Sequence, residues 1–293
     1  MNIQTLEERL PHYFRLAQRL SGGGILAYRP VRLPSGGTEA TNLRDYTPGD
    51  DPWHIDWGIC ARHDELRVRE YAGTARRHAT LLLDASSNLA LSSRAKETQR
   101  TAALTLAYCL LAQGALLEVG AFSQTLTLEP PYSGTPRMGA LHRFLRELQP
   151  RPESVDFTRT ISAFLKRRHL VGDVFVLSDF FAGSDSFQKD FQEGLERLMA
   201  DGCTPRVIHL LNAENRADHM TGDVEIIDAK GFHRVITLTE SDLQAYQKRY
   251  FEYLDSVQTY CRGHAIPYTR VESDATPHVQ ILTALGLPAN CVS

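Results

Sequence analysis

The sequence predicts an α/β fold with a mostly parallel sheet covered by helices on both faces. Apolar runs of buried-strand length alternate with helical segments along most of the chain: ATLLLDAS, LLEVGAFS, GDVFVLSDF and PRVIHLLN. Strands that are apolar on both faces are typical of parallel sheets enclosed between helical layers. A chain of 293 residues, 42% of them hydrophobic and 23% charged, is long enough to form one elaborated domain of this kind.

The segments between these strands have helical spacing. The pattern predicts helices over residues 96–115, 137–148, 158–169 and 187–200. The segment TLTLEP follows the strand LLEVGAFS closely and is expected to pair with it as a hairpin. The uncharged stretch from Thr101 to Leu117 contains Gln113 and Gly114 and is slightly short for a membrane span. It is therefore predicted to be a buried helix, and no membrane span is expected.

The alternation of strands and helices is interrupted near the C-terminus. A β-hairpin insertion is predicted near 223–239, with Gly231 in its turn. Thr239 and Asp242 then have the spacing of a capping box and open a long helix. One stripe of that helix is expected to be buried, comprising Leu243, Tyr246, Tyr250, Leu254, Val257 and Cys261. A last short helix is expected over 277–285.

The N-terminal quarter has a different composition. Helical spacing over 6–20 is followed by a region rich in proline, glycine and charge that contains both tryptophans. We predict two parts: residues 1–75 as an N-terminal helix and a β-rich or irregular segment packing on the core, and 76–293 as the α/β domain.

Composition and charge exclude several function classes. The net charge of −3 gives no reason to expect a nucleic-acid partner, and the basic cluster Lys166, Arg167 and Arg168 is interpreted as a solvated helix face. The five cysteines are widely spaced, which argues against a disulfide framework or a zinc knuckle. The first residues contain acids and lack an apolar run, so no signal peptide is expected. A cytoplasmic location is the simplest expectation.

Polar side chains follow two of the predicted strands where each strand ends. Asp84, Ser86 and Asn88 come after one strand, and Ser178 and Asp179 come after another. Ligands of open parallel sheets gather beyond the carboxyl ends of the strands. Carboxylate, hydroxyl and amide oxygens are the ligands that Mg²⁺ prefers, so Asp84, Ser86, Asn88 and Asp179 are the predicted metal ligands if the two strands are neighbours.

A purely structural alternative remains open for these residues. Ser and Asn after a strand commonly form turns, and an Asp at a strand end often only caps the next helix. Taken alone, the DASSN stretch favours that interpretation, whereas the second acid, Asp179, makes the two comparable.

A rival site lies in the polar run from Asp45 to Tyr71. Its residues Asp50, Asp51, His54 and Asp56 supply the groups of a metal-dependent hydrolase. The local sequence also has a structural explanation. PGDDP is typical of a turn, and Trp53, Ile55 and Trp57 alternate like a strand that packs one face on a core.

The string NLRDYTPGDDPWHIDWGICARHDELRVREY, followed by TLLLDASSN and later by FVLSDFF and YTRVESDATPHVQILTAL, resembles the family called domain of unknown function 58. The resemblance covers nearly the whole chain after about Gly24. It implies a doubly wound, von Willebrand A-like domain of Rossmann type with a metal-ion-dependent adhesion site (MIDAS), in which Asp84, Ser86, Asn88 and Asp179 hold a Mg²⁺ ion. Because no N-terminal membrane helices are expected, the chain resembles the short, soluble branch of the family.

The family also implies a function. Its members are associated with MoxR-type AAA+ ATPases in complex assembly or chaperone-like maturation and are not known as enzymes, so a protein-interaction module with an unidentified client is expected. The sequence departs from the family pattern at Asn88, where Ser is usual, and at Val155, where Thr is usual. Valine cannot bind a metal, and Ser154 or Thr158 are the hydroxyls near enough in sequence to replace that threonine.

Overall fold

A computed structural model describes the chain in segments: residues 32–33, 40–47, 55–63, 65–71, 73–74, 77–86, 92–149, 155–167, 172–181, 185–217, 220–227 and 233–284. The chain divides into two compact units, one comprising residues 28–76 and the other containing residues 77–293. The helix predicted over 6–20 lies outside the described residues.

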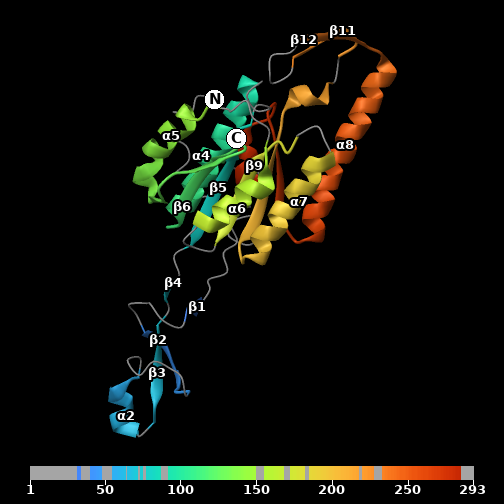
Figure 1. Ribbon diagram of the computed structural model, residues 1–293. Coiled ribbons are helices and arrows are strands. Elements are labelled where there is room, and N and C mark those ends of the chain that lie inside the picture. Colours follow the sequence, from blue (N-terminus) through green and yellow to red (C-terminus); the bar gives the residue numbers. More distant parts are fainter. Residues whose placement is uncertain are drawn as a thin grey trace. The chain divides into compact units, whose positions relative to one another are not determined.

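The larger unit is built on a seven-stranded sheet with the order β13-β10-β9-β5-β6-β7, in which β8 also pairs with β6 (Figure 1). The strands are β5 (His78–Asp84), β6 (Leu116–Phe122), β7 (Leu126–Leu128), β8 (Tyr132–Ser133), β9 (Asp173–Ser178), β10 (Thr204–Leu211) and β13 (Tyr268–Glu272). All pairs are parallel except those of β7 and β8 with β6. The chain leaves β5 towards β6 and later returns to β9 on the other side, so the strand order reverses between β5 and β9. The predicted mostly parallel sheet and its hairpin are confirmed.

Helices cover both faces of this sheet, as the sequence predicts. One face packs against α4 (Ser93–Ala112), α5 (Met138–Glu147) and α9 (Pro277–Ala284). The other packs against α6 (Phe157–Arg167), α7 (Asp185–Ala200) and α8 (Glu240–Gly263). Strand β5 feeds both cores, because Leu81 and Leu83 face the first layer and Leu82 the second. The sheet is therefore doubly wound, in the Rossmann-type, von Willebrand A-like arrangement. Within the described segments, no helix combines the length and hydrophobicity needed to cross a membrane.

The C-terminal insertion is a β-hairpin of β11 (Gly222–Ile227) and β12 (His233–Leu238), paired antiparallel. The turn that contains Gly231 lies outside the described residues. The capping box at the start of α8 is confirmed, with the Thr239 and Asp242 side chains each accepting from the other's backbone N–H. These hydrogen bonds from Thr239 lower the pKa of Asp242. The predicted stripe is buried except at Tyr246, which is 39% exposed because its hydroxyl donates to the backbone oxygen of Asn215 at the surface.

The smaller unit contains two antiparallel strand pairs and a helix. Strand β1 (Arg32–Leu33) pairs with β4 (Gly73–Thr74), and β2 (Ala40–Asp45) pairs with β3 (Arg67–Tyr71). The β-rich character predicted for this region is confirmed. The prediction that Trp57 continues a strand is wrong: the helix α2 (Trp57–His63) begins there, and Trp57 is 61% exposed. The strand ends because the Asp56 carboxylate accepts hydrogen bonds from the N–H groups of Gly58 and Ile59 and thereby caps the helix.

Short 3₁₀ turns complete the larger unit. They are η2 (Thr135–Arg137), which leads into α5, and η3 (Ala213–Arg216), which follows β10.

Close packing between α6 and α7 depends on Gly194, because a Cβ there would lie 2.3 Å from the ring of Phe157. The sheet and its six helices thus form a rigid frame for the strand ends.

Charged side chains join three strands at the amino-terminal edge of the sheet. The nearly buried carboxylate of Asp173 on β9 accepts from Arg77 Nε at 2.8 Å and from Arg206 Nε on β10, also at 2.8 Å. The two guanidinium groups lie on opposite sides of the carboxylate's strand, next to β5 and on β10. This network ties together the amino-terminal ends of β5, β9 and β10.

We expect Asp173→Asn to destabilise the protein by about 3–5 kcal/mol, because it leaves two buried arginines without their common counter-charge. Urea unfolding followed by circular dichroism measures this change. Glu193→Gln is a matched control: it removes the exposed partner of Arg197 on α7 and is expected to cost less than about 1 kcal/mol. An Asp173→Asn variant as stable as this control would show that the network does not hold the strands.

Candidate functional site

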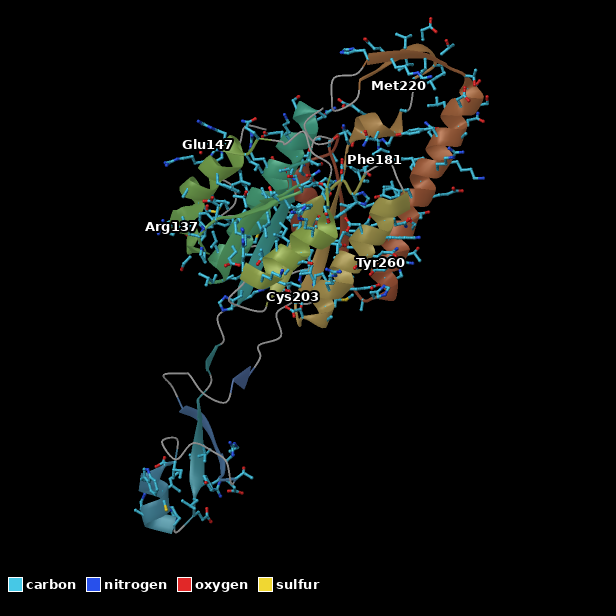
Figure 2. All side chains as sticks on the ribbon, in the orientation of Figure 1. Arg137, Glu147, Phe181, Cys203, Met220 and Tyr260 are labelled. Carbon is cyan, nitrogen blue, oxygen red and sulfur yellow. The ribbon has the colours of Figure 1, made fainter. Side chains whose placement is uncertain are left out.

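The residues predicted to bind a metal come from neighbouring strands. Strands β5 and β9 are parallel partners, with Leu83 opposite Leu177, so Asp84 and Ser178 are adjacent across the two strands. Asp179 follows directly. The carboxyl edge that they occupy is the upper edge of the sheet in Figure 2, where the labelled Phe181 lies, whereas Cys203 marks the opposite edge. This is the point of strand-order reversal at which doubly wound sheets place their ligands.

Asp84 is buried, and each of its oxygens has a defined partner. Oδ1 accepts from the backbone N–H of Ser86 at 2.8 Å, and Oδ2 accepts from the hydroxyl of Ser178. The backbone oxygen of Asp84 accepts from Gln99 Nε2 of α4 at 2.8 Å. The strand ends at Asp84 because its side chain closes a turn onto Ser86, so the extended alternation predicted beyond Asp84 stops there.

Asp179 is fixed mainly through its backbone. Its Oδ1 accepts from the N–H of Phe181 at 3.1 Å. Its backbone oxygen accepts from Nε2 of His209, a buried side chain on β10, at 2.9 Å. His209 Nδ1 lies 2.8 Å from the hydroxyl of Tyr268, which in turn accepts from Arg270 Nε. This chain of donors defines the neutral imidazole with its proton on Nε2.

Desolvation shifts the pKa values of Asp84 and His209, which are buried, and of Asp179, which is half-buried. It raises the pKa of Asp84, against the hydrogen bonds from Ser178 and Ser86 that favour the carboxylate. Burial, followed by the negative charge of Asp84, raises the pKa of Asp179 to about 8. Burial lowers the pKa of His209 to about 3. Two acids thus face each other where ionising both is costly, an arrangement that a divalent cation relieves.

A hydroxyl beside Asp84 fits the same interpretation. The Ser86 side chain is buried, and among the described residues its oxygen has no hydrogen-bond partner that satisfies distance and angle. The hydroxyl lies close enough to the Asp84 carboxylate to lower its pKa, but a buried hydroxyl without a well-formed hydrogen bond is costly, and a metal ligand bond would satisfy it. Asn88 lies outside the described residues. The candidate ligands among the described residues are therefore Asp84, Ser86 and Asp179, with Ser178 beside them. The described segments hold no group of three or more His, Cys, Asp or Glu side chains that could hold a metal ion.

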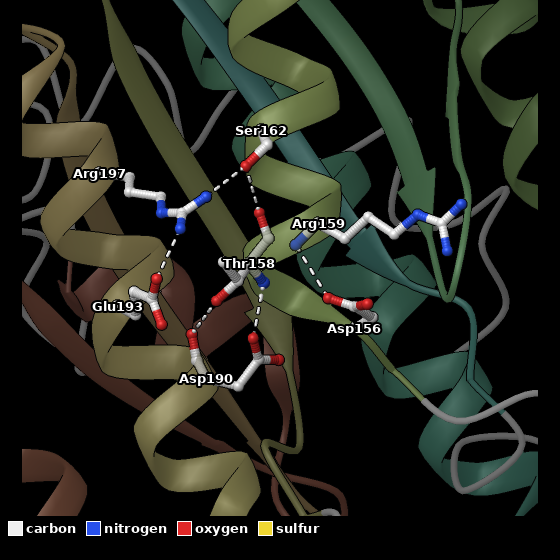
Figure 3. Close-up of polar contacts among 7 residues, drawn as sticks. All are labelled: Asp156, Thr158, Arg159, Ser162, Asp190, Glu193 and Arg197. Carbon is white, nitrogen blue, oxygen red and sulfur yellow. Dashed lines mark hydrogen bonds and ion pairs between the residues drawn. The ribbon is translucent and has the colours of Figure 1, made fainter.

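The loop before α6 also reaches this edge, through a hydrogen bond from Asp156 N–H to the Ser123 backbone oxygen at 3.2 Å. Val155 packs against the second core, and Ser154 lies outside the described residues. Thr158, the other hydroxyl expected to be able to replace the missing threonine, is hydrogen-bonded elsewhere in the structure. Its hydroxyl donates to the Asp190 backbone oxygen and its N–H to the Asp190 carboxylate, both on α7 (Figure 3). These bonds cap α6 and turn Thr158 away from the sheet edge.

Of the rival hydrolase cluster, Asp50, Asp51 and His54 lie outside the described residues. Asp56 has a structural role, since its carboxylate caps α2. It belongs to the smaller unit, whereas Asp84 and Asp179 belong to the larger one.

Sequence reasoning missed the residues that hold the backbone in place next to the site. Gln99, His209 and Tyr253 each hydrogen-bond a backbone oxygen of the strand ends. His209 could have been singled out from the sequence, because it interrupts an otherwise apolar strand, RVIHLL. Gln99 and Tyr253 lie on helices where nothing local distinguishes them from packing or surface residues.

The fold and the strand ends define a doubly wound domain with a buried acidic pocket at its switch point. The chain belongs to the family described as "Protein of unknown function DUF58", whose family model matches residues 42–252. The resemblance noted in the sequence is thereby confirmed.

Similar proteins were found among curated sequences and solved structures. The uncharacterized proteins Mb1516 of Mycobacterium bovis and Rv1480 of Mycobacterium tuberculosis are each 26% identical over 154 residues, which is 50% of this chain and 49% of theirs. The chain thus spans about half the length of the curated relatives it matches. The conserved hypothetical protein BatB from Bacteroides thetaiotaomicron is 14% identical, with a TM-score of 0.43 over 72% of this chain and 97% of its own. Proximal thread matrix protein 1 of the mussel byssus, with a zinc-occupied MIDAS motif, is 15% identical, with a TM-score of 0.38 over 46% of this chain and 38% of its own.

The shifted acids predict how stability depends on pH without metal. The pKa of Asp179 is 3.8 in the unfolded chain and about 8 in the folded protein. Between these two pH values the folded protein binds a proton that the unfolded chain does not, so the folded protein loses stability as pH rises. His209 acts oppositely below 6.5, because the unfolded histidine takes up a proton that the folded one does not. The two effects offset each other below pH 6.5, and the loss is therefore concentrated between pH 6.5 and 8.

Urea unfolding in EDTA at pH 6.5, 7.25 and 8 measures this loss, and Asp179→Asn is expected to reduce it, because only Asp84, whose pKa burial also raises, then contributes. The slope attributable to one such group is at most about 1.4 kcal/mol per pH unit. Parallel curves for wild type and Asp179→Asn would show that the residue is already ionised in the folded protein.

Proposed function

We propose that this domain is a non-enzymatic protein-interaction module that holds a divalent cation, Mg²⁺ in the cell, at the carboxyl edge of its sheet. Asp84, Ser86 and Asp179 bind the ion, and Asn88 is the remaining candidate ligand from the sequence. The observation that carries the proposal is a pair of acids, Asp84 buried and Asp179 half-buried, next to the buried Ser86 hydroxyl, which has no well-formed hydrogen bond within the described residues, at the switch point of the sheet. A helix cap alone would require neither the second acid nor the buried Ser86 hydroxyl.

The donor chemistry supports a hard cation. All the proposed ligands are oxygens, and the two carboxyl groups supply the negative charge that Mg²⁺ or Mn²⁺ requires. The hydroxyl of Ser178 donates to Asp84, which orients the carboxylate in the way that outer hydrogen bonds orient metal ligands. When bound, the ion supplies Lewis acidity towards an external oxygen ligand.

A metal ion that is held by only a few protein ligands keeps coordination positions open for a docking partner. The Val155 side chain has no oxygen, and the Thr158 hydroxyl is hydrogen-bonded to α7, so neither side chain is proposed as a ligand. An ion with open positions takes up a carboxylate from outside, and we therefore propose that the site binds an Asp or Glu side chain of a partner protein. His209 is neutral and buried, and its proton is committed to the Asp179 backbone, so its role is to position that residue.

The partner that we propose is a MoxR-type AAA+ ATPase, with an unidentified client, in complex assembly or chaperone-like maturation in the cytoplasm. This part rests on the family to which the chain belongs. The domain would present its cation to an acidic residue of the ATPase or of the client.

Metal binding is expected to depend on Asp84. Calorimetric titration with Mg²⁺ and with Mn²⁺ at pH 8 should show binding to wild type and at least about tenfold weaker binding to Asp84→Asn, because the amide cannot supply the charge. Glu193→Gln, with the same charge change on exposed α7, should bind like wild type. The proposed site would be contradicted if no protein, wild type included, gave a heat of binding and added metal left every melting temperature unchanged.

Partner binding is expected to depend on the ion. Tagged wild type should co-purify an AAA+ ATPase in Mg²⁺ and lose it in EDTA, whereas Asp84→Asn should not retain it in either buffer. Mass spectrometry of the eluates identifies the partner. Recovery of the same ATPase with both proteins regardless of metal would show that it binds elsewhere, and recovery of no ATPase in Mg²⁺ would contradict the proposed partner.

A further inference from the structure

The turn that follows β9 has a backbone conformation that its sequence does not favour. Phe180 has a φ of 49°, in the left-handed region that is uncommon for a bulky residue. Glycine would relieve the backbone, but the ring of Phe180 is part of the core, with its centroid 4.3 Å from that of Phe191 and 5.2 Å from that of His209. Such a conformation persists only where the surrounding contacts impose it.

Hydrogen bonds hold this turn from three sides. The N–H of Phe180 donates to Ser178 Oγ at 2.9 Å, and that hydroxyl donates to Asp84. The preceding carbonyl, of Asp179, accepts from His209. The carbonyl of Phe180 itself accepts from the hydroxyl of Tyr253, on helix α8. Of these groups, only Tyr253 comes from outside the sheet.

We propose that Tyr253 is a positioning residue for the cation site, whose hydroxyl holds Phe180 in the left-handed conformation and thereby keeps Asp179 beside Asp84. The inference rests on the proposed function, because it assigns Tyr253 a role in that same site. It adds a residue from a helix that contributes no ligand.

The geometry of the turn explains why a restraint on Phe180 matters for Asp179. A bulky residue ordinarily has a negative φ, so the left-handed conformation of Phe180 depends on the contacts around it. Relaxation of Phe180 to an ordinary backbone conformation would move Asp179, its direct neighbour, relative to Asp84. A binding-competent turn that is populated only part of the time weakens the apparent affinity in proportion.

The placement of Tyr253 suits this role. Its ring is edge-on to those of Phe181 and His209, at centroid distances of 6.1 and 6.4 Å, so the hydroxyl is directed at the turn by packing on both sides. Phenylalanine at this position would keep these ring contacts and remove only the hydrogen bond. Tyr253→Phe is therefore a test that leaves the core filled.

Tyr260→Phe is the matched control. Tyr260 lies on the same helix, and its hydroxyl also donates to a backbone oxygen, that of Gln192 on α7, at 3.2 Å. Titration with Mn²⁺ at pH 8 should show about tenfold weaker binding for Tyr253→Phe, the change that about 1.4 kcal/mol produces. Tyr260→Phe should bind within about twofold of wild type, since the energetic cost of its lost hydrogen bond falls on α7 and not on the turn.

A second measurement reports on the turn without metal. Hydrogen exchange of the Phe180 and Phe181 amides should be faster in Tyr253→Phe than in wild type or Tyr260→Phe, at similar melting temperatures. Equal Mn²⁺ affinities for the three proteins would overturn the positioning role, as would equal exchange rates. If wild type itself binds no Mn²⁺, the proposed cation site is wrong, and the exchange rates then decide separately whether Tyr253 holds the turn.

Discussion

The central constraint in this domain is the juxtaposition of Asp84 and Asp179 at the end of two adjacent parallel strands. The register between β5 and β9 places the strand ends together, and the surrounding protein removes much of the water that would otherwise solvate the acids. Without a bound cation, the free energy of this edge therefore depends on whether the two carboxyl groups are protonated, hydrogen-bonded or moved apart. The hydrogen bonds of Ser178, His209 and Tyr253 all act on this short stretch of backbone.

The two edges of the sheet use opposite electrostatic solutions. At the amino edge, Asp173 lies between two arginines, and the charges are satisfied within the protein. At the carboxyl edge, Asp84 is bonded by neutral donors, a hydroxyl and a backbone N–H, and neither brings a positive charge. The first edge thus stabilises the fold, whereas the second leaves a charge that an external cation can balance.

The architecture was predictable because it rests on patterns that each segment carries locally. The apolar runs, the capping box at Thr239 and the hairpin that follows η3 each have a local physical cause. Asp84 and Asp179 could be paired from sequence because parallel strands end at one edge. Trp57 was misassigned because alternation over a few residues also fits a bridge at Ile55 followed by a helix that Asp56 caps.

The supporting residues were not predictable, since their roles depend on contacts between distant segments. Thr158 has the right chemistry and sequence position for a metal ligand, but Asp190 of α7 binds both its hydroxyl and its N–H. Tyr253 lies in the middle of a long helix, and only the packing of α8 brings its hydroxyl to Phe180. A site with few fixed ligands depends more strongly on such supports, because each ligand that is free to move lowers the population of the binding-competent edge. In the proposed cation site, the absence of a side-chain oxygen at Val155 makes the restraint of the turn at Phe180 more important.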